Sequence, residues 1–331
     1  MENEQFFISK VVILNGAAGF IGSHLTDKLL QAGARVIGID NLITGKRANL
    51  AEAEKNTNFA FVQHDLNDAA GTVALLGQIQ AQYGAIDLVF QLASPASPRG
   101  YQQHPVETYL VNSYALHIIC QWLRDHSPQT RLLFSSTSEA YGNPEVHPQV
   151  ETYWGNVNPN GPRSCYDESK RLGEAICGIF YRNFGLNTRI IRIFNTYGPR
   201  MDLEDGRVLP QFVRQIKNGE PLTVYGDGLQ TRSYCFVDDL VEGICRFMAS
   251  QHAGETVNLG NPGEYTVLET ARIANAVAGR DPEMLEYREL PVDDPLRRQP
   301  NIDKARQLFG WQPQISFDEG IRRMFASYGI L

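Results

Sequence analysis

Two short polar segments hold the residue types in this chain that could do chemistry. The first is Ser136-Thr137-Ser138-Glu139, and the second contains Tyr166 and Lys170. Residues four apart lie on the same face of a helix, one turn from each other, so Tyr166 and Lys170 would be neighbours there. A lysine ammonium beside a phenol favours the phenolate. Tyr166 would then act as a base near neutral pH, well below its ordinary pKa of about 10.

The first segment adds hydroxyls from Thr137 and Ser138 and the carboxylate of Glu139. It follows Arg131–Ser135, a mostly apolar run that predicts a buried parallel strand. Together the two segments indicate a site for hydride transfer, with Glu139 as one further acid/base group that narrows the reaction.

A glycine-rich segment near the N-terminus predicts a dinucleotide site. Gly16, Gly19 and Gly22 follow an apolar run and open a helical pattern. Glycines at this spacing give a tight turn, bring backbone N–H groups close to a pyrophosphate and let the helix pack against the strand. Glycine also serves ordinary turns, but the strand-to-helix context is the one that the motif requires.

Two acidic residues at strand ends bear on which dinucleotide binds. Asp40 ends the second predicted strand, where a carboxylate accepts hydrogen bonds from ribose hydroxyls and repels a 2′-phosphate. This favours NAD, while Lys46 and Arg47 close behind leave NADP open. Asp65, at the end of the third strand, suits the adenine edge, and its alternative role is the N-cap of the next helix.

The elements that must position these residues follow from an alternation of short apolar runs with helical patterns. This alternation predicts an α/β fold with a Rossmann-type doubly wound parallel sheet. The expected strands are 10–15, 35–39, 59–63, 86–91, 131–135 and 188–193, and the expected helices are 20–31, 71–82, 105–125 and 166–184.

After Ile193 the pattern changes, and it predicts a smaller α/β C-terminal domain that binds the substrate. Its segments are rich in Gly, Pro and charge, with helices at 208–218, 238–249, 267–278, 303–309 and 317–328 and a strand at 256–259. We expect a dinucleotide-binding domain over 1–194 and 235–261, and a substrate-binding domain over 195–234 and 262–331. The chain would cross between the two more than once.

Composition excludes several classes of protein. The chain has 331 residues, with 43% hydrophobic and 20% charged residues, as in globular proteins with a sizeable core. A formal charge of −7 and the lack of a basic block argue against a nucleic-acid surface. The five cysteines show no metal-ligand spacing, so we expect reduced thiols, no metal site and a cytoplasmic protein. The acidic N-terminus is unlike a signal peptide, and no apolar run approaches the roughly 18 residues of a membrane span.

With these residues in view, the chain resembles the extended short-chain dehydrogenase/reductase family of sugar-nucleotide enzymes. The glycine loop, the Tyr166/Lys170 pair and Arg192–Arg200 carry this resemblance. Several longer strings are similar to the UDP-glucuronate decarboxylases, also called UDP-xylose synthases. They are Leu92–Pro98, Glu151–Pro159, Gly161–Glu168, Asp205–Val208, Thr223–Gly228 and Asn258–Glu264, and the similarity runs from about residue 10 to 325.

The resemblance implies a reaction in which UDP-glucuronate becomes UDP-xylose. Tyr166, held anionic by Lys170, removes the proton of the sugar 4-hydroxyl while C4 gives hydride to NAD⁺, and Thr137 hydrogen-bonds the same oxygen. The resulting β-keto acid loses CO₂ to leave an enolate. Protonation at C5 and return of hydride to C4 complete the cycle and regenerate NAD. The family also implies a homodimer that pairs through two long helices, 106–125 and 166–184, whose apolar stripes could equally face the core.

Ser138, Glu139 and Arg298 are the residues expected to serve the decarboxylation half. A guanidinium at Arg298 can hold the carboxylate and later influence protonation at C5, although a surface arginine beside Arg297 is the alternative. Glu139 either acts as acid/base or orients the substrate.

The remaining site residues are expected to bind the two nucleotides. Candidates for the phosphates are Asn195, Arg207 and Arg232. Tyr225 would stack on uracil or belong to the core, and Tyr101 would reach the sugar. The residues expected to bind NAD are Gly16, Gly19, Phe20, Ile21, Gly22, Asp40, Asn41, Thr44, Asp65, Leu66, Leu92, Ser94, Tyr166, Lys170 and Thr196.

The sequence departs from the family pattern in three places. Ala17 stands where a second glycine is usual, so either the loop binds NAD less tightly or the position needs no left-handed backbone. Gln299 replaces the usual lysine after Arg298, and Gln102-Gln103-His104 replaces an aromatic-rich segment, which would alter sugar contacts.

Three other functions remain open on the sequence. One is the same chemistry stopped early, with release of the 4-keto pentose and NADH. A second is a nucleotide-sugar 4,6-dehydratase or 4-epimerase, but dehydratases carry Asp at the position of Ser138, which is a poor acid, and epimerases usually lack Glu139. The third is a non-catalytic NAD-sensing scaffold, which the presence of both Tyr166 and Lys170 disfavours.

Overall fold

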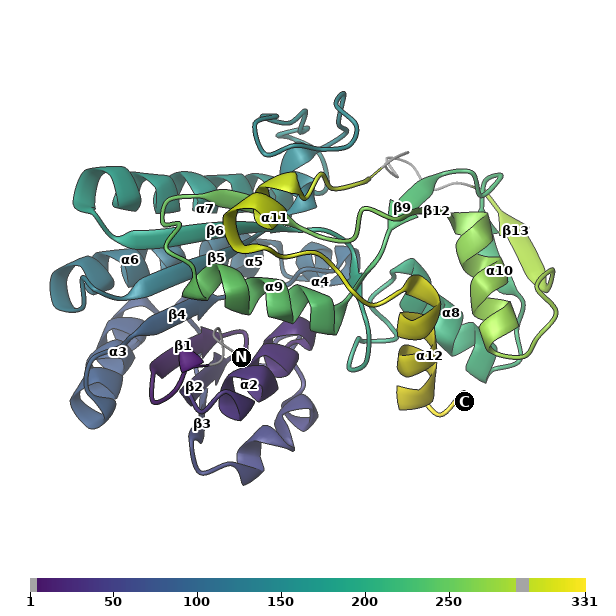
Figure 1. Cartoon of the computed structure of the whole chain (residues 1–331). Coiled ribbons are helices and arrows are strands. Elements are labelled where there is room, and N and C mark those ends of the chain that lie inside the picture. The colour runs from purple at the N-terminus through teal and green to yellow at the C-terminus, as the bar shows by residue number, and fades with distance from the viewer. Residues whose placement is uncertain (1–4, 290–297) are drawn as a thin grey trace.

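The larger part of the molecule is built on one parallel sheet (Figure 1). The computed structural model describes residues 5–289 and 298–331, and within them seven strands lie in the order β3-β2-β1-β4-β5-β6-β11. Their bounds are β1 (Val11–Asn15), β2 (Arg35–Asp40), β3 (Phe59–Gln63), β4 (Leu88–Gln91), β5 (Arg131–Thr137), β6 (Asn187–Ile193) and β11 (Thr256–Leu259). All neighbours pair in parallel, which confirms the predicted Rossmann-type doubly wound sheet.

Helices cover both faces of this sheet, as short βαβ connections require. One layer contains α2 (Phe20–Gln31), α9 (Val237–Ala249) and α11 (Asp303–Phe309), and the other contains α3 (Ala69–Tyr83), α5 (Pro105–Asn112), α6 (Tyr114–His126) and α7 (Ser164–Phe184). Each layer has its own hydrophobic core. Leu25 and Ile244 lie in one core, while Ile119 and Cys177 lie in the other.

Two boundaries differ from those predicted in ways that matter for the site. Strand β5 continues to Thr137, so Ser136 and Thr137 belong to the strand itself. The single helix expected over 105–125 is broken at Ser113, whose hydroxyl donates to the carbonyl of Tyr109. This competition for a helical carbonyl favours a break. The side-chain amide of Asn112, next to the break, donates to Ser94 Oγ at 3.0 Å and Ser169 Oγ at 3.2 Å.

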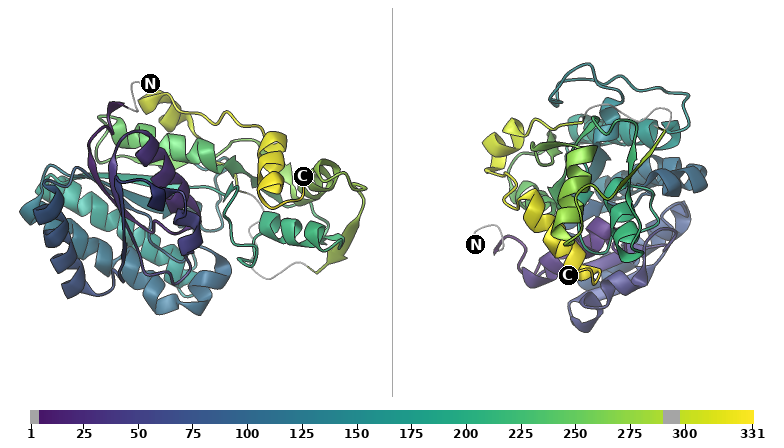
Figure 2. Two further views of the ribbon diagram at one scale, coloured as in Figure 1. Left: turned by 90° about the horizontal axis from the view of Figure 1, so that it is seen from below. Right: turned by 90° about the vertical axis from the view of Figure 1, so that its right-hand side faces the viewer.

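A smaller lobe lies beside one end of the sheet (Figures 1 and 2). Its helices are α8 (Val208–Lys217), α10 (Val267–Val277) and α12 (Phe317–Ser327). Short strands pair there or at its border: β7 (Thr196–Tyr197) with β10 (Cys235–Phe236), β8 (Leu222–Tyr225) with β13 (Leu285–Arg288), and β9 (Thr231–Ser233) with β12 (Glu264–Thr266). The sequence did not predict these strands, because segments of two to four residues are too short to show a period.

The chain visits the sheet again between two passages through the smaller lobe. After β10 it forms α9, which packs against α2, and then β11, which extends the sheet beside β6. Short turns of helix complete the described fold: α4 (Pro98–Gln103) and 3₁₀ turns at Arg47–Leu50, Ala53–Lys55 and Ser138–Tyr141. Within residues 5–289 and 298–331, the helices are too short or too polar to cross a membrane, and no cluster of metal-ligating side chains is found.

Candidate active site

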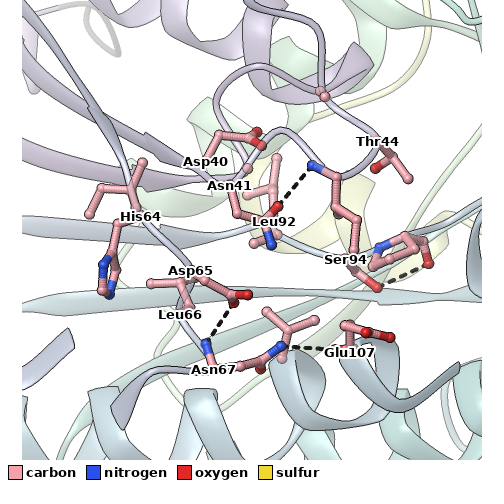
Figure 3. Close-up of a pocket in the computed structure, with 18 residues that line it drawn as sticks. Asp40, Asn41, Thr44, His64, Asp65, Leu66, Asn67, Leu92, Ser94 and Glu107 are labelled. Carbon is pink, nitrogen blue, oxygen red and sulfur yellow. Dashed lines mark hydrogen bonds between the residues drawn. The ribbon is translucent and has the colours of Figure 1, made fainter. Parts of the chain in front are cut away.

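A large cleft lies between the carboxyl ends of the sheet strands and the smaller lobe, where ligands bind in doubly wound folds. The predicted residues that line it are Gly16, Gly19, Phe20, Ile21, Gly22, Thr44, Leu92, Ser94, Tyr101, Thr137, Ser138, Glu139, Tyr166, Lys170, Asn195, Thr196, Arg207, Arg232 and Arg298. A smaller cavity continues from it past Gly16 and Ser94, and Asp40, Asn41, Asp65 and Leu66 line its walls (Figure 3). Tyr225 lines neither cavity.

The glycine loop has the shape that the motif predicts. Gly16 has a φ of +83°, a left-handed conformation that glycine adopts without strain. A Cβ on Gly22 would lie 2.0 Å from the Gly16 carbonyl oxygen, so helix α2 can approach the loop only with glycine there. Ala17 is not among the described residues with positive φ. Its position therefore needs no left-handed backbone in this structure, and the affinity of the loop for NAD stays a prediction.

Asp40 organises two loops around the smaller cavity. Its carboxylate accepts hydrogen bonds from the backbone N–H of Ala18 at 2.9 Å and of Leu42 at 2.8 Å. Burial raises the pKa of this carboxyl, although the two N–H groups offset part of the effect. Asp40 therefore holds the glycine loop in place as well as facing the cavity.

Asp65 is not a helix N-cap, so that alternative was wrong. Helix α3 is capped by Asp68, whose Oδ1 accepts from the backbone N–H of Gly71 at 3.0 Å. Asp65 accepts from the backbone N–H of Asn67 at 2.9 Å and lies on the cavity wall (Figure 3). The two cavities adjoin each other, because both are lined by Gly16, Gly19, Ile43, Thr44, Gly45, Leu92 and Ser94.

Helix α7 brings Tyr166 and Lys170 to the bottom of the cleft, both almost fully buried. Lys170 Nζ lies 5.7 Å from the centre of the Tyr166 ring and donates to the Ser135 carbonyl at 2.7 Å. Burial raises the pKa of Tyr166 and a hydrogen bond with Thr137 only partly offsets it, while burial lowers the pKa of Lys170 to about 7. Desolvation disfavours both charged forms in this structure, so the role of Lys170 in holding Tyr166 anionic stays a prediction.

Glu139 lies between two arginines. Thr137 caps the 3₁₀ turn that carries it, its hydroxyl accepting from the Glu139 N–H at 3.2 Å. One carboxylate oxygen accepts from Arg298 and the other from Arg163. Burial raises the pKa of Glu139, but the two guanidinium groups outweigh it and lower the pKa overall. Glu139 is therefore an anion and an acceptor in this structure.

Arg298 is not a surface residue, so that alternative was also wrong. Its side chain is 4% exposed. Besides the pair with Glu139, it donates to Ser138 Oγ and to the Gly142 carbonyl, each at 3.2 Å. Segment 293–297, which precedes Arg298 in the sequence motif and includes Arg297, lies outside the described residues.

Arg163, which donates to Glu139, was not among the residues predicted from the sequence. It stands three residues before Tyr166 in a string that resembled the family, but no spacing rule connects it with Glu139. Its Nε lies 3.9 Å from Oδ2 of Asp167, a second buried carboxylate. Within the described residues, Asp167 Oδ1 is buried without a hydrogen-bond partner. Burial and then the charge of Glu139 raise the pKa of Asp167 to about 7.

The other predicted substrate residues are dispersed around the cleft. The ring of Tyr101 stacks on Tyr166 with 5.1 Å between centroids, and its buried hydroxyl has no hydrogen-bond partner in the described part of the chain. Arg207 Nε donates to Asp205 at 2.7 Å. Gln299 turns toward the smaller lobe, where its side-chain amide donates to the Pro262 carbonyl at 2.8 Å.

Known proteins are similar in sequence to this chain over almost its whole length. The family model described as GDP-mannose 4,6 dehydratase matches residues 13–324. UDP-glucuronic acid decarboxylase 2 of Arabidopsis thaliana is 45% identical over 319 residues, which is 96% of this chain and 68% of that protein. UDP-glucuronic acid decarboxylase 6 of the same plant is 42% identical over 327 residues, 98% of this chain and 90% of that protein.

The structural comparison agrees. A crystal structure of UDP-glucuronic acid 4-epimerase from Bacillus cereus, in complex with UDP-glucuronic acid and NAD, has a TM-score of 0.83 and 26% identity. The alignment covers 96% of this chain and 98% of that one. With 42 to 45% identity to decarboxylases and the Tyr166, Lys170, Glu139 and Arg298 side chains gathered in one cleft, this chain is an enzyme of the UDP-glucuronic acid decarboxylase family within the extended short-chain dehydrogenases/reductases.

Proposed function

We propose that this enzyme converts UDP-glucuronate to UDP-xylose and CO₂, with NAD regenerated in each cycle. The observation that carries the proposal is the buried group of Ser138, Glu139 and Arg298 beside the Tyr166/Lys170 pair. A buried guanidinium can recognise the carboxylate of a uronic acid through charge-assisted, bidentate hydrogen bonds. A serine at the position of Ser138 cannot supply the proton that loss of water would need.

The dinucleotide would lie along the two joined cavities. The backbone of the Gly16–Gly22 loop and the start of α2 would hold the pyrophosphate, Asp40 the ribose, and the wall formed by Asp65 and Leu66 the adenine. Bound NAD⁺ supplies the hydride acceptor at C4, and its positive ring favours the Tyr166 phenolate that burial by itself disfavours.

In the oxidation half, Tyr166 takes the proton of the sugar 4-hydroxyl and Thr137 hydrogen-bonds the same oxygen. Lys170 keeps the phenol oriented from within α7, one turn further along. The hydrogen at C4 of the sugar would leave with its electron pair, as hydride, to the bound dinucleotide. The sugar would then be a 4-ketone whose C6 carboxylate is β to a carbonyl.

In the decarboxylation half, Arg298 holds the substrate carboxylate. It pairs with Glu139 in this structure, so substrate and Glu139 compete for one guanidinium, and Arg163 keeps Glu139 stabilised during the exchange. The C5–C6 bond breaks and CO₂ leaves. The electron pair of the broken bond is held in the 4,5-enolate. A proton taken up from solvent would then add to C5, Tyr166 would return its proton to O4, and the hydride would return to C4 from the bound dinucleotide.

Three further properties complete the proposal. Residues 1–194 with 235–261 would bind NAD, and residues 195–234 with 262–331 would bind the nucleotide sugar.

Two copies would pair through the outer faces of α5 and α7, because Val106, Tyr109, Leu172 and Ile179 are each 44 to 51% exposed there. All five cysteines are free thiols, which fits a reducing compartment, and we propose the cytoplasm.

The test is incubation of the purified enzyme with UDP-glucuronate carrying ¹³C at C6, followed by NMR, first without added NAD and then with it. Labelled CO₂ together with UDP-xylose supports the full cycle, and turnover without added NAD would show retained cofactor. Labelled CO₂ with a 4-keto pentose and accumulating NADH would favour early release. Absence of labelled CO₂ under both conditions would refute the proposed reaction.

A further inference from the structure

Asn258, in strand β11, is a fully buried side chain that lines neither cavity and yet is joined to both halves of the decarboxylation site. Its side-chain amide donates to the carbonyls of Gln149 at 3.0 Å and Asn301 at 3.1 Å. Its side-chain oxygen accepts from the hydroxyl of Tyr141 at 2.7 Å. Both amide N–H groups and the carbonyl are therefore in use.

The first branch leads to Glu139. Tyr141 ends the 3₁₀ turn Ser138–Tyr141 that carries the carboxylate. Its ring is 1% exposed and lies 4.6 Å from the guanidinium of Arg192, which is itself paired with Glu174 at 2.7 Å. The ring is held by packing, so its hydroxyl bond to Asn258 links this turn directly to β11.

The second branch leads to Arg298. Two hydrogen bonds of 2.9 Å join Gln149 and Gln299. The backbone N–H of Gln149 donates to the backbone carbonyl of Gln299, and the backbone N–H of Gln299 donates to the side-chain oxygen of Gln149. The backbone N–H of Asn301 then donates to the Gln149 carbonyl at 2.9 Å. Asn258 binds both carbonyls at the end of this ladder, so it fixes the backbone immediately after Arg298.

We infer that Asn258 is a positioning residue that sets the placement of Glu139 relative to Arg298. The two branches meet again at the ion pair of these residues and at the bond from Arg298 to the Gly142 carbonyl, one residue after Tyr141. The result is a closed ring of hydrogen bonds around the decarboxylation site. The inference rests on the proposed function, because it assigns Asn258 to the step that Glu139 and Arg298 serve.

Each branch can be cut separately. Asn258→Asp keeps an acceptor for Tyr141 and, when ionised, loses the donors to Gln149 and Asn301. Tyr141→Phe keeps the ring and loses only the hydroxyl. Tyr197→Phe is the matched control, because its equally buried hydroxyl donates to the Phe317 carbonyl at 3.1 Å, away from Glu139 and Arg298.

The first measurement is the ratio of dissociation constants for UDP-xylose and UDP-glucuronate, by calorimetry on enzyme loaded with NADH, which cannot oxidise either ligand. The two differ only by the carboxylate. In Asn258→Asp we expect the dissociation constant of UDP-xylose divided by that of UDP-glucuronate to fall about tenfold below its wild-type value. The affinity for UDP-xylose should stay within about twofold of wild type, because a displaced Arg298 loses only its bond to the substrate carboxylate. We expect Tyr141→Phe to slow release of labelled CO₂ about tenfold, with UDP-glucuronate affinity within about twofold.

The inference would be overturned if Asn258→Asp kept the wild-type ratio of dissociation constants and Tyr141→Phe kept the wild-type rate of CO₂ release. The proposed reaction would still stand in that case. If Asn258→Asp lost affinity equally for UDP-xylose and UDP-glucuronate, and Tyr141→Phe released CO₂ at the wild-type rate, the role of Asn258 would be merely structural. That result would also overturn the inference. A wild-type ratio near one would instead refute the role of Arg298 in the proposed function, and the inference with it.

Discussion

Two carboxyl groups, Asp167 at the start of α7 and Glu139 on the adjacent turn, have pKa values shifted in opposite directions because their cationic partners differ. Glu139 is held by Arg163 and Arg298, which keep its pKa low despite burial. Arg163 lies 3.9 Å from Asp167, and burial and the charge of Glu139 outweigh the effects of Arg163 and Arg298 on its pKa. Glu139 is thus suited to pair with cations during catalysis, and Asp167 to hold a proton.

Asp167→Asn is expected to raise stability increasingly as pH rises. The folded-state pKa of about 7 is above the ordinary value of 3.8, so the folded protein keeps a proton that the unfolded chain loses. The stability from this proton is complete below about pH 4 and is lost as pH rises to about 7. Asn mimics the neutral acid throughout, so the variant should gain roughly 2 kcal/mol over wild type between about pH 5 and pH 8. Urea unfolding of Asp167→Asn and of wild type at both pH values measures the free energies of unfolding. A difference between the two proteins that is the same at both pH values would contradict the prediction.

Tyr166→Phe should remove the base and leave the substrate site intact. The ring keeps its stack on Tyr101, with 12° between the planes, and only the hydroxyl beside Thr137 is lost. Loss of a positioned base typically slows proton transfer about 10²- to 10⁴-fold. Single-turnover absorbance of reduced nicotinamide measures hydride transfer, with Tyr197→Phe as the control. Hydride transfer at the wild-type rate would exclude Tyr166 as the base.

At the scale of elements, the dinucleotide site depends on how closely α2 approaches β1. A Cβ at Gly22 would overlap the Gly16 carbonyl, so the helix and the loop have no room to adjust independently. In α3, by contrast, Gly77 has nothing within 4 Å of a built Cβ. The two helical glycines therefore differ in function although both sit in predicted helices.

Gly22→Ala should lower NAD affinity by tenfold or more and destabilise the fold, because the loop must move to relieve the overlap. Gly77→Ala should leave NAD affinity unchanged and raise stability by about 0.5–1 kcal/mol through better helix propensity. Calorimetric NAD titration and thermal unfolding of both variants check the pair. Equal NAD affinity in the two would mean that the loop is not the pyrophosphate site.

For the whole molecule, half-exposed apolar side chains gather on α5 and α7. These helices contact each other and form an outer surface of the sheet domain. Leu172, 51% exposed, is in this surface, whereas Leu229, 63% exposed, lies between β8 and β9 in the smaller lobe.

Leu172→Asp is expected to shift the proposed dimer to a monomer, because a charge would then be buried against the partner's apolar surface. Leu229→Asp should leave the oligomeric state unchanged. Light scattering coupled to size-exclusion chromatography at matched concentrations measures both. A wild-type monomer, or a dimer that survives Leu172→Asp, would rule out this surface as the interface.

The sequence was sufficient for the doubly wound sheet and for most of the residues that line the cleft. Apolar runs and helical periods are local properties, and motif spacing reports local geometry, so Gly16–Gly22 and the Tyr166/Lys170 pair could be placed without coordinates. Short strands such as β7 and β9 could not be predicted, because only tertiary pairing stabilises segments of two or three residues.

Tertiary structure decided the electrostatics. Whether Tyr166 is a phenolate depends on burial as well as on Lys170, and no sequence pattern reports desolvation. The pair of Glu139 with Arg163 and Arg298 joins residues 24 and 159 positions apart in the chain. Asn258 meets Tyr141 only because β11 returns to the sheet beside β6. The sequence by itself determined which groups are available for chemistry, and the fold decided which of them meet, because contacts between distant segments depend on how the sheet and the smaller lobe pack.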